Sequence, residues 1–492
     1  MILKYSLSMP FLSSLSRALD LKKRTRFVTF RWVLLMFILG FYGVTLLYVN
    51  AQFPQMHVDE GFQIELSRRP FWEITQVLTG DMHPPLYSYL LHFWLAIFGV
   101  GVFSARSFSI LTSLASAVIF YRLLRHRLGV ISALLGTGLF VSFPMVLVYG
   151  VVARNYALLL LALVSLLAYV YLNWSAPLTK RHLTGLIALQ AVALYTHNLA
   201  IPLLAAGYVF FYLSRPSKAR LKHYSLAALG TGLVFLPWAI VILNQLTLRS
   251  GEAGWVTFEP LADWHELASA VFPKLNGQKR FFAWGATAAL YLFTLRVWRK
   301  KVTPYARTTA VILGLGILFL YLLSFAQPLF YDRYLLVTLP FLAYLVAHAF
   351  PTEFLRKVTV AGLLVLLNFG VFNYVAQDFR NGDFADAEAG VFATDKEFTT
   401  VFDLPTYYFH FRVLGYQNAY VFDPARTAPT WSGKALLRPS EYLSPNDLEG
   451  VTLIQYISQR DVAFEEYFAD HGFEVVAQRD IGGREIYLFE RR

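Results

Sequence analysis

Two short polar segments interrupt the apolar first part of the sequence and carry the side chains best suited to chemistry. The first holds Asp59 and Glu60, and the second, Gly80–Leu86, holds Asp81 and His83. Carboxylate and imidazole groups can act as general bases or bind polar ligands. Because both segments adjoin long apolar runs, they indicate a site that acts on a lipid-borne substrate at a membrane surface.

Each segment also has a structural explanation. Acidic residues at the start of a helix satisfy free N–H groups and the helix dipole, so Asp59 and Glu60 alone favour helix capping. Pro84-Pro85 likewise suits the first turn of a helix, where the missing N–H costs nothing. The combination is more specific, because a carboxylate pair soon after the first apolar run is followed by His-Pro-Pro-Leu at the start of another apolar helix.

The composition places most of the chain in lipid. Hydrophobic residues make up 57% of the 492 residues and charged residues only 15%, whereas soluble proteins have about 25% charged residues. The net charge of +12 arises from short basic clusters between apolar runs, a pattern typical of membrane topology and not of nucleic-acid binding. The sequence has no Cys, which excludes disulfides and thiolate metal sites.

Eleven apolar runs predict spanning helices, each of which needs about 20 mostly apolar residues. These runs are 32–50, 105–123, 129–149, 156–173, 183–200, 201–213, 224–243, 281–297, 308–326, 334–349 and 358–375. A further run, Leu86–Phe98, is ambiguous. If it lies flat at the interface, every basic cluster from Lys22 to Lys357 falls on one side, which the positive-inside rule makes cytoplasmic. If it spanned, the later clusters would move outside, so the flat orientation is favoured.

This topology gathers the polar residues on the outer side of the membrane. The N-terminal segment 1–30 is cytoplasmic, and the first outer loop, 51–104, holds both polar segments. Four later connections lie on the same side: the turns near Arg154 and His197, the turn Asp332–Arg333, and the loop 244–280. This loop could cover the site as a lid. The predicted helices contain no Asp or Glu, so ion-coupled transport loses support.

The composition changes abruptly near the C-terminus, and segment 376–492 is predicted to be a separate extracytoplasmic domain. Its predicted elements are a strand at Val451–Ser458, a helix at Val462–His471, and a hairpin of Phe473–Gln478 and Glu485–Phe489 joined through Asp480–Arg484. The expected fold class is therefore an all-α polytopic membrane domain, 31–375, followed by a small α/β domain.

The motifs of the membrane part resemble the GT-C membrane glycosyltransferases, in particular the group that includes the protein O-mannosyltransferases and the aminoarabinose transferase acting on lipid A. The matching segments are Asp59-Glu60, Asp81–Tyr87, Phe98-Gly99, Ala105-Arg106 and, more weakly, Ala153–Tyr156 and Arg333–Leu335 followed by Pro340. The resemblance implies a polyprenyl-phosphate sugar as donor and a catalytic role for Asp59. It leaves the acceptor open among a lipid, a polysaccharide and a protein.

The chemistry of such a transfer needs few charged residues. A departing phosphate requires no acid to protonate it, so one base is sufficient. Asp59 would accept the proton of an acceptor hydroxyl in an inverting single displacement, while Glu60 and His83 would orient that carboxylate or bind sugar hydroxyls. Positive charge would stabilise the leaving phosphate. The cations placed for this are Arg106, Arg154 and Arg333, although an arginine at a helix end can instead simply reach the interface.

Several expectations complete the sequence-based prediction. His197 is a candidate substrate-binding residue, with a hydrogen-bonded structural role as the alternative. Asp81 and Asp59 could share a divalent cation, since carboxylates suit hard cations, but no metal-ligand spacing stands out. The competing functions are a polytopic lipid or glycan transporter, which should show broken helices or midplane charges, and a non-catalytic membrane scaffold. The short loops and the lack of Cys favour a bacterial inner membrane.

Overall fold

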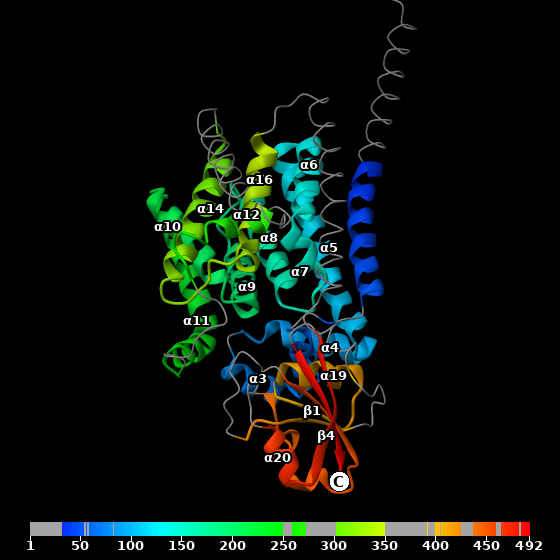
Figure 1. Ribbon diagram of the computed structural model, residues 1–492. Helices are drawn as coiled ribbons and strands as arrows, with labels where there is room; N and C mark the ends of the chain where they lie inside the picture. Colours follow the sequence, from blue (N-terminus) through cyan, green and yellow to red (C-terminus); the bar gives the residue numbers. More distant parts are fainter. Residues whose placement is uncertain are drawn as a thin grey trace, which may run out of the picture.

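A bundle of helices stands against a small mixed β-sheet in the computed structural model (Figure 1). The structure describes residues 32–53, 56, 59–81, 83–248, 258–271, 302–349, 391, 399–403, 405–424, 436–458, 464–481 and 484–492. Short helices lie between the bundle and the sheet, and Asp59, Glu60, Asp81 and His83 lie in them or in the segments that precede them.

The upright helices of the bundle follow the predicted apolar runs. They are Trp32–Gln52, α5 (Val102–Leu128), α6 (Val130–Ser142), α7 (Pro144–Val151), α8 (Tyr156–Leu172), α9 (Lys180–Thr196), α10 (Ala200–Leu213), α11 (Lys218–Leu248), α14 (Pro304–Leu323) and α16 (Leu339–Ala349). By length and composition, four helices of the described part could each cross a membrane: Trp32–Gln52, Val102–Leu128, Lys218–Leu246 and Pro304–Leu323. The membrane character is thereby confirmed, whereas the predicted number of eleven spans is not.

Three features explain why the count differs. The predicted runs 156–173, 183–200, 201–213 and 334–349 form α8, α9, α10 and α16, which have 17, 17, 14 and 11 residues and are each shorter than a full span. The predicted runs 281–297 and 358–375 lie outside the described residues. The predicted run 129–149 forms α6 and α7, which are bent by 65° and count as one span only when taken together. The bend lies at Phe143, which is extended (φ −63°, ψ 133°), because the residue before a proline is disfavoured in the helical region.

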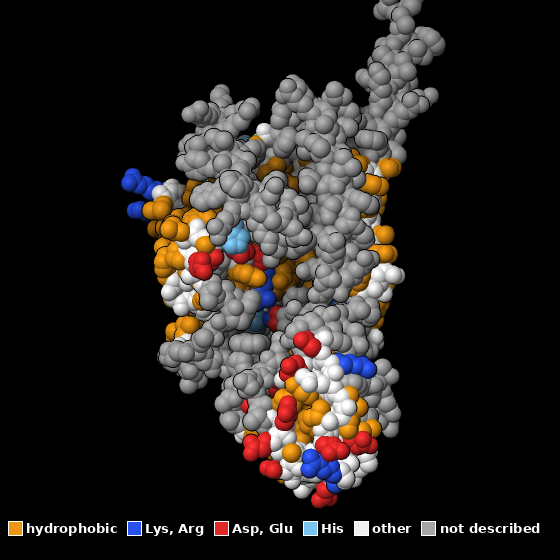
Figure 2. All heavy atoms as spheres, viewed as in Figure 1, with side chains coloured by type: hydrophobic (Ala, Val, Ile, Leu, Met, Phe, Trp, Pro, Cys, Tyr) orange, Lys and Arg blue, Asp and Glu red, His pale blue; other side chains and the backbone are white. Residues whose placement is uncertain are grey.

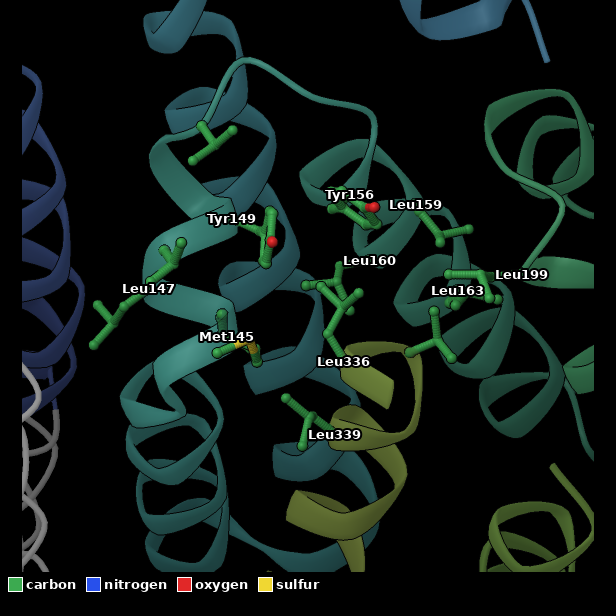
Figure 3. Packing of buried hydrophobic residues seen from close by; sticks show 14 of the residues in the cluster. Met145, Leu147, Tyr149, Tyr156, Leu159, Leu160, Leu163, Leu199, Leu336 and Leu339 are labelled. Atoms are coloured by element: carbon green, nitrogen blue, oxygen red, sulfur yellow. The ribbon is translucent and has the colours of Figure 1, made fainter. Parts of the chain in front are cut away.

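Close packing holds the centre of the bundle together. Figure 3 shows Met145 and Tyr149 of α7, Leu160 of α8, and Leu336 and Leu339 directed toward one another, and all five are buried. Since lipid tails are as apolar as these side chains, helices in a membrane associate through close packing and polar contacts. The packed centre fixes the ends of α7 and α8, and the turn between them reaches the candidate site.

The first outer loop forms three short helices, α2 (Glu60–Ser67), α3 (Phe71–Thr79) and α4 (Leu86–Phe98). Figure 1 shows α3 and α4 between the upright helices and the sheet. With 13 residues, α4 is shorter than the about 20 that a spanning helix needs. It packs against α2, α5 and α9, so the loop is tied to the bundle along its length.

The C-terminal part contains a five-stranded sheet with the order β2-β1-β3-β5-β4. Its elements are β1 (Thr399–Phe402), α19 (Pro405–Leu414), β2 (Ala419–Val421), β3 (Leu453–Ser458), α20 (Phe464–Asp470), β4 (Phe473–Ile481) and β5 (Arg484–Arg491). The predicted strand β3, helix α20 and β4–β5 hairpin are confirmed. The parallel part, β1 and β2 with the connecting α19, was not predicted.

Candidate active site

Connections from five parts of the chain meet at the end of the bundle nearest the sheet. Asp59 immediately precedes α2, the Asp81–His83 segment precedes α4, Arg154 lies between α7 and α8, His197 lies between α9 and α10, and Arg333 lies in the short helix α15 (Asp332–Leu335). Figure 2 shows basic, acidic and histidine side chains gathered in a recess of the bundle surface next to the sheet. The structure thus brings together the residues that the predicted topology placed outside.

Asp59 lies between two guanidinium groups. Its Oδ2 is 3.7 Å from Nη2 of Arg154 and 3.5 Å from Nη1 of Arg333. Although Asp59 is the N-cap residue of α2, its side chain makes no capping hydrogen bond, so helix capping does not explain this carboxylate. The side chain is 27% exposed, and an incoming ligand can therefore reach it.

Glu60, the next residue, has a different environment. Its Oε1 and Oε2 accept hydrogen bonds from Nε and Nη2 of Arg106, at 2.9 and 2.6 Å, and both side chains are fully buried. The backbone N–H of Ala153 also donates to Oε1 at 2.7 Å, and Arg106 Nη1 donates to the Phe53 carbonyl. This arrangement ties α2 to α5 and to the turn that carries Arg154. The expected roles of Glu60 in catalysis and of Arg106 in phosphate binding stay predictions.

A series of polar side-chain contacts begins at Asp81. Its Oδ2 lies 3.2 Å from Nδ1 of His83, and Nε2 of His83 lies 3.3 Å from Nη2 of Arg154. Because a guanidinium can only donate, Nε2 of His83 accepts and Nδ1 carries the proton that is donated to Asp81. This series of contacts, from Asp81 through His83 to Arg154, therefore ends at the guanidinium that faces Asp59.

His197 is held in one tautomer. Its Nδ1 accepts a hydrogen bond from the Leu199 N–H at 3.1 Å, which leaves the proton on Nε2. That Nε2 is buried and has no hydrogen-bond partner among the described residues. The ring lies 5.3 Å from Tyr156 and 5.4 Å from His83. Burial, together with the neighbouring His83 and Arg154, holds the pKa of His197 well below its usual value, so the ring is a neutral donor.

Arg333 is positioned by aromatic and acidic neighbours. Its guanidinium lies over the ring of Tyr334, 5.0 Å from the centroid, and Nη2 donates to the Tyr334 hydroxyl. The start of α15 is held by α12 (His265–Val271), because the Asp332 N–H donates to Oε2 of Glu266 at 3.0 Å. Arg333 is therefore fixed from two sides.

The loop predicted as a lid is partly described, and that part supports α15. Trp264 packs against Tyr321 and Phe330, with ring centroids 5.1 and 5.4 Å apart. Tyr321 also donates a hydrogen bond to the Pro260 carbonyl. Residues 249–257 and 272–300 lie outside the described part, so the lid stays a prediction.

Three residues near the site were not predicted. Tyr156 lies beside His197, and the ring of Tyr149 lies 4.5 Å from that of Tyr156. The motif Ala153–Tyr156 was the one available signal for Tyr156. Gln245, near the end of α11, donates hydrogen bonds to the backbone carbonyls of Leu78, Thr79 and Asp81. A lone Gln in an apolar helix has no pattern that predicts such a contact.

The predicted divalent cation has no evident ligand set. In the part of the chain that the structure describes, no group of three or more His, Asp or Glu side chains is arranged to hold a metal ion. Asp59 faces two guanidinium groups and Asp81 faces an imidazole. The cation that these carboxylates could share stays a prediction.

Comparison with known proteins supports the resemblance. Residues 82–242 match the family model described as dolichyl-phosphate-mannose-protein mannosyltransferase. A search of curated proteins finds no match. Among solved structures, ArnT from Cupriavidus metallidurans in the apo state has a TM-score of 0.64 at 14% identity, covering 95% of this chain and 98% of that one.

Two further structures are similar. ArnT bound to undecaprenyl phosphate has a TM-score of 0.60 at 15% identity, covering 93% of this chain and 98% of that one. The apo oligosaccharyltransferase of Archaeoglobus fulgidus has a TM-score of 0.50 at 11% identity, covering 86% of this chain and 69% of that one. At these identities the likeness is one of fold. With the family match at residues 82–242, it confirms that this chain resembles the GT-C membrane glycosyltransferases, as its motifs predicted.

Proposed function

We propose that this protein transfers a sugar from a polyprenyl-phosphate carrier to an acceptor hydroxyl outside the cytoplasm, with Asp59 as general base. The observation that carries the proposal is the partly exposed Asp59 carboxylate between Arg154 and Arg333. One group that can accept a proton and two that can bind a phosphate thus lie within one site. An ArnT structure of the same fold is bound to undecaprenyl phosphate, which supports a donor of this class.

The proposed reaction is a single displacement with inversion. The acceptor oxygen forms a bond to the anomeric carbon and gives its proton to Asp59. The bond from that carbon to the phosphate oxygen breaks, and its electron pair leaves with the phosphate. Arg154 and Arg333 stabilise the departing charge. When the phosphate engages these guanidinium groups, the Asp59 carboxylate is released from them and becomes available to the acceptor.

Two buried donors add support for an oxygen-rich ligand. Among the described residues, Nε of Arg154 and Nε2 of His197 have no hydrogen-bond partner. Buried donors without partners are rare in folded proteins. A phosphate or sugar oxygen would supply the acceptor they need. Glu60 and Arg106 act in this proposal by holding α2 in place, while Asp81 and His83 orient Arg154.

The proposal includes the sidedness of the protein. The N-terminus is cytoplasmic, the C-terminal domain is extracytoplasmic, and the chain lies in the bacterial inner membrane. The donor and the acceptor then meet at the outer surface, where the recess next to the sheet opens. The acceptor is a lipid, a polysaccharide or a protein that presents a hydroxyl group there.

The test is the substitution Asp59→Asn, which keeps the shape and removes the base. Loss of a positioned base lowers a rate by about 100- to 10,000-fold. Transfer from polyprenyl-phosphate sugars would be measured with purified protein in lipid nanodiscs, with Asp480→Asn on the exposed surface of β4 as the matched control. Full transfer by Asp59→Asn would rule out this mechanism. A transporter or a scaffold would show no transfer in the unchanged protein.

A further inference from the structure

The helix that Asp59 precedes is too short to hold its own position. α2 has eight residues, and isolated helices of fewer than about 12 residues are marginal in water. Its placement must come from the elements around it. α4 and α5 cover one part of α2, and its most extensive contact is with α19 of the C-terminal part.

Gly61 of α2 closely approaches the backbone of α19. A Cβ atom at this position would lie 2.9 Å from the backbone nitrogen of His410 and 3.1 Å from the carbonyl carbon of Phe409. These are backbone atoms of a helix, so they cannot move aside as a flexible side chain would. Glycine is therefore required here for close approach of two backbones. Beside it, the rings of Phe62 and Phe409 meet edge to face, 5.9 Å apart.

Ion pairs also join the first outer loop to the C-terminal part, at a greater distance from Asp59. Arg438 of the C-terminal part pairs with Glu73 of α3 at 2.7 Å. Arg69 lies 3.2 Å from Glu441, 3.4 Å from Glu65 and 3.6 Å from Glu73. The Arg69 side chain is only 8% exposed. The end of α2 is thus joined to the C-terminal part through charge, and its beginning through Gly61.

From these contacts we infer that the C-terminal domain positions the catalytic base: α19 holds α2, and α2 holds Asp59 between Arg154 and Arg333. Gly61 is then a positioning residue. The C-terminal domain contributes to the active site by holding α2, whether or not it also contacts the acceptor. This inference rests on the proposed function, because it gives Asp59 the role of base.

The direct test is Gly61→Ala, with Gly314→Ala as the matched control. Gly314 also lies within a helix, α14, but a Cβ there meets nothing within 4 Å. A displacement of about 1 Å at a reacting group can cost about 100-fold in rate. We expect Gly61→Ala to lower kcat by about 10- to 100-fold, to bind undecaprenyl phosphate as the unchanged protein does, and to increase hydrogen exchange in α2 and α19. Gly314→Ala should leave all three unchanged.

A second set of variants covers the case in which Gly61→Ala fails to fold. Glu73→Gln and Arg438→Gln each remove the ion pair, and Arg492→Gln, which removes the exposed pair with Glu474 on the sheet, is the matched control. Each of the first two changes should lower kcat by about two- to five-fold, the effect expected of an exposed pair, and should raise exchange in α2. Arg492→Gln should change neither.

The outcomes separate the two proposals. If the unchanged protein transfers sugar, and Gly61→Ala and the charge variants keep full kcat with unchanged exchange in α2, the inference is overturned. If the unchanged protein transfers no sugar, the proposed function fails, and hydrogen exchange alone decides whether α19 holds α2. Unchanged exchange in Gly61→Ala overturns that docking as well.

Discussion

Two adjacent carboxylates have opposite environments at this site. Asp59 is 27% exposed between two guanidinium groups, whereas Glu60 is fully buried with Arg106. Successive residues at a helix start point about 100° apart because a helix has 3.6 residues per turn. Asp59 can therefore contact a substrate, whereas Glu60, the next residue, holds the loop in place.

The buried pair predicts a loss of stability in Glu60→Gln. Removal of one partner leaves the Arg106 guanidinium buried and uncompensated, which costs about 3–5 kcal/mol. We expect a clearly lower midpoint of thermal unfolding in detergent, whereas Asp59→Asn should unfold near the temperature of the unchanged protein. Replacement of both partners, Glu60→Leu with Arg106→Met, should recover part of the stability. An unchanged midpoint in Glu60→Gln would contradict a structural role for the pair.

His197 predicts a dependence of stability on pH. Burial, followed by the nearby His83, Arg154 and Arg333, lowers its pKa in the folded protein, while the unfolded chain has a pKa of about 6.5. Below that pH the unfolded state binds a proton that the folded state does not, so stability falls as the pH falls. His197→Gln should show a weaker decline of the unfolding midpoint between about pH 7 and pH 5. Parallel curves for the two proteins would refute this assignment.

At the scale of elements, α11 holds the loop between α3 and α4. The Gln245 side chain is buried and donates to the carbonyls of Leu78 and Thr79 at 3.0 and 3.1 Å, and also to that of Asp81. Leu78 and Thr79 end α3, and the Leu78 carbonyl also accepts a hydrogen bond from the Asp81 N–H at 3.2 Å. One side chain of a long helix thus fixes the start of the Asp81–His83 segment.

Gln245→Ala should therefore weaken binding at the site. Loss of buried hydrogen bonds costs about 1–3 kcal/mol, and part of this should appear as a KM for the donor raised about three- to ten-fold. The control is Gln76→Ala on the exposed side of α3, which should keep the original KM. If Gln245→Ala has unchanged KM and kcat, the contact has no part in placing Asp81.

At the scale of the whole molecule, the site depends on which ends of the helices share one side of the membrane. Asp59, Arg154, His197 and Arg333 all lie in or next to connections, and none of them lies in the four candidate spans. A site built from connections can combine residues far apart in the chain because the helices that carry them pack together. The C-terminal sheet then covers the loop at the same end.

The sidedness can be tested by single cysteines, because the natural chain has none. We expect a membrane-impermeant maleimide to label Gln76→Cys and Asp480→Cys in spheroplasts with an intact inner membrane. Arg181→Cys, at the start of α9, should be labelled only after lysis. All three positions are exposed. Labelling of Arg181→Cys in intact spheroplasts, with protection of the other two, would reverse the proposed orientation.

The sequence by itself determined the class of protein, and it singled out Asp59, His83, Arg154 and Arg333, which the structure brings together. Apolar runs identified the membrane part, and basic clusters assigned the polar connections to one side. The β4–β5 hairpin and α20 were also predictable, because alternating residues and turn signals are local features. These properties depend on neighbours in sequence, which composition and periodicity report directly.

Only the tertiary structure decided which of these residues contact one another. The Glu60–Arg106 pair spans 46 residues and the Gln245–Leu78 contact spans 167, and no local pattern encodes such pairings. The need for glycine at Gly61 became visible only with the backbone of α19 beside it. Long-range contacts depend on how whole helices pack, so the burial of Glu60 against Arg106 beside the partly exposed Asp59 became visible only in the folded protein.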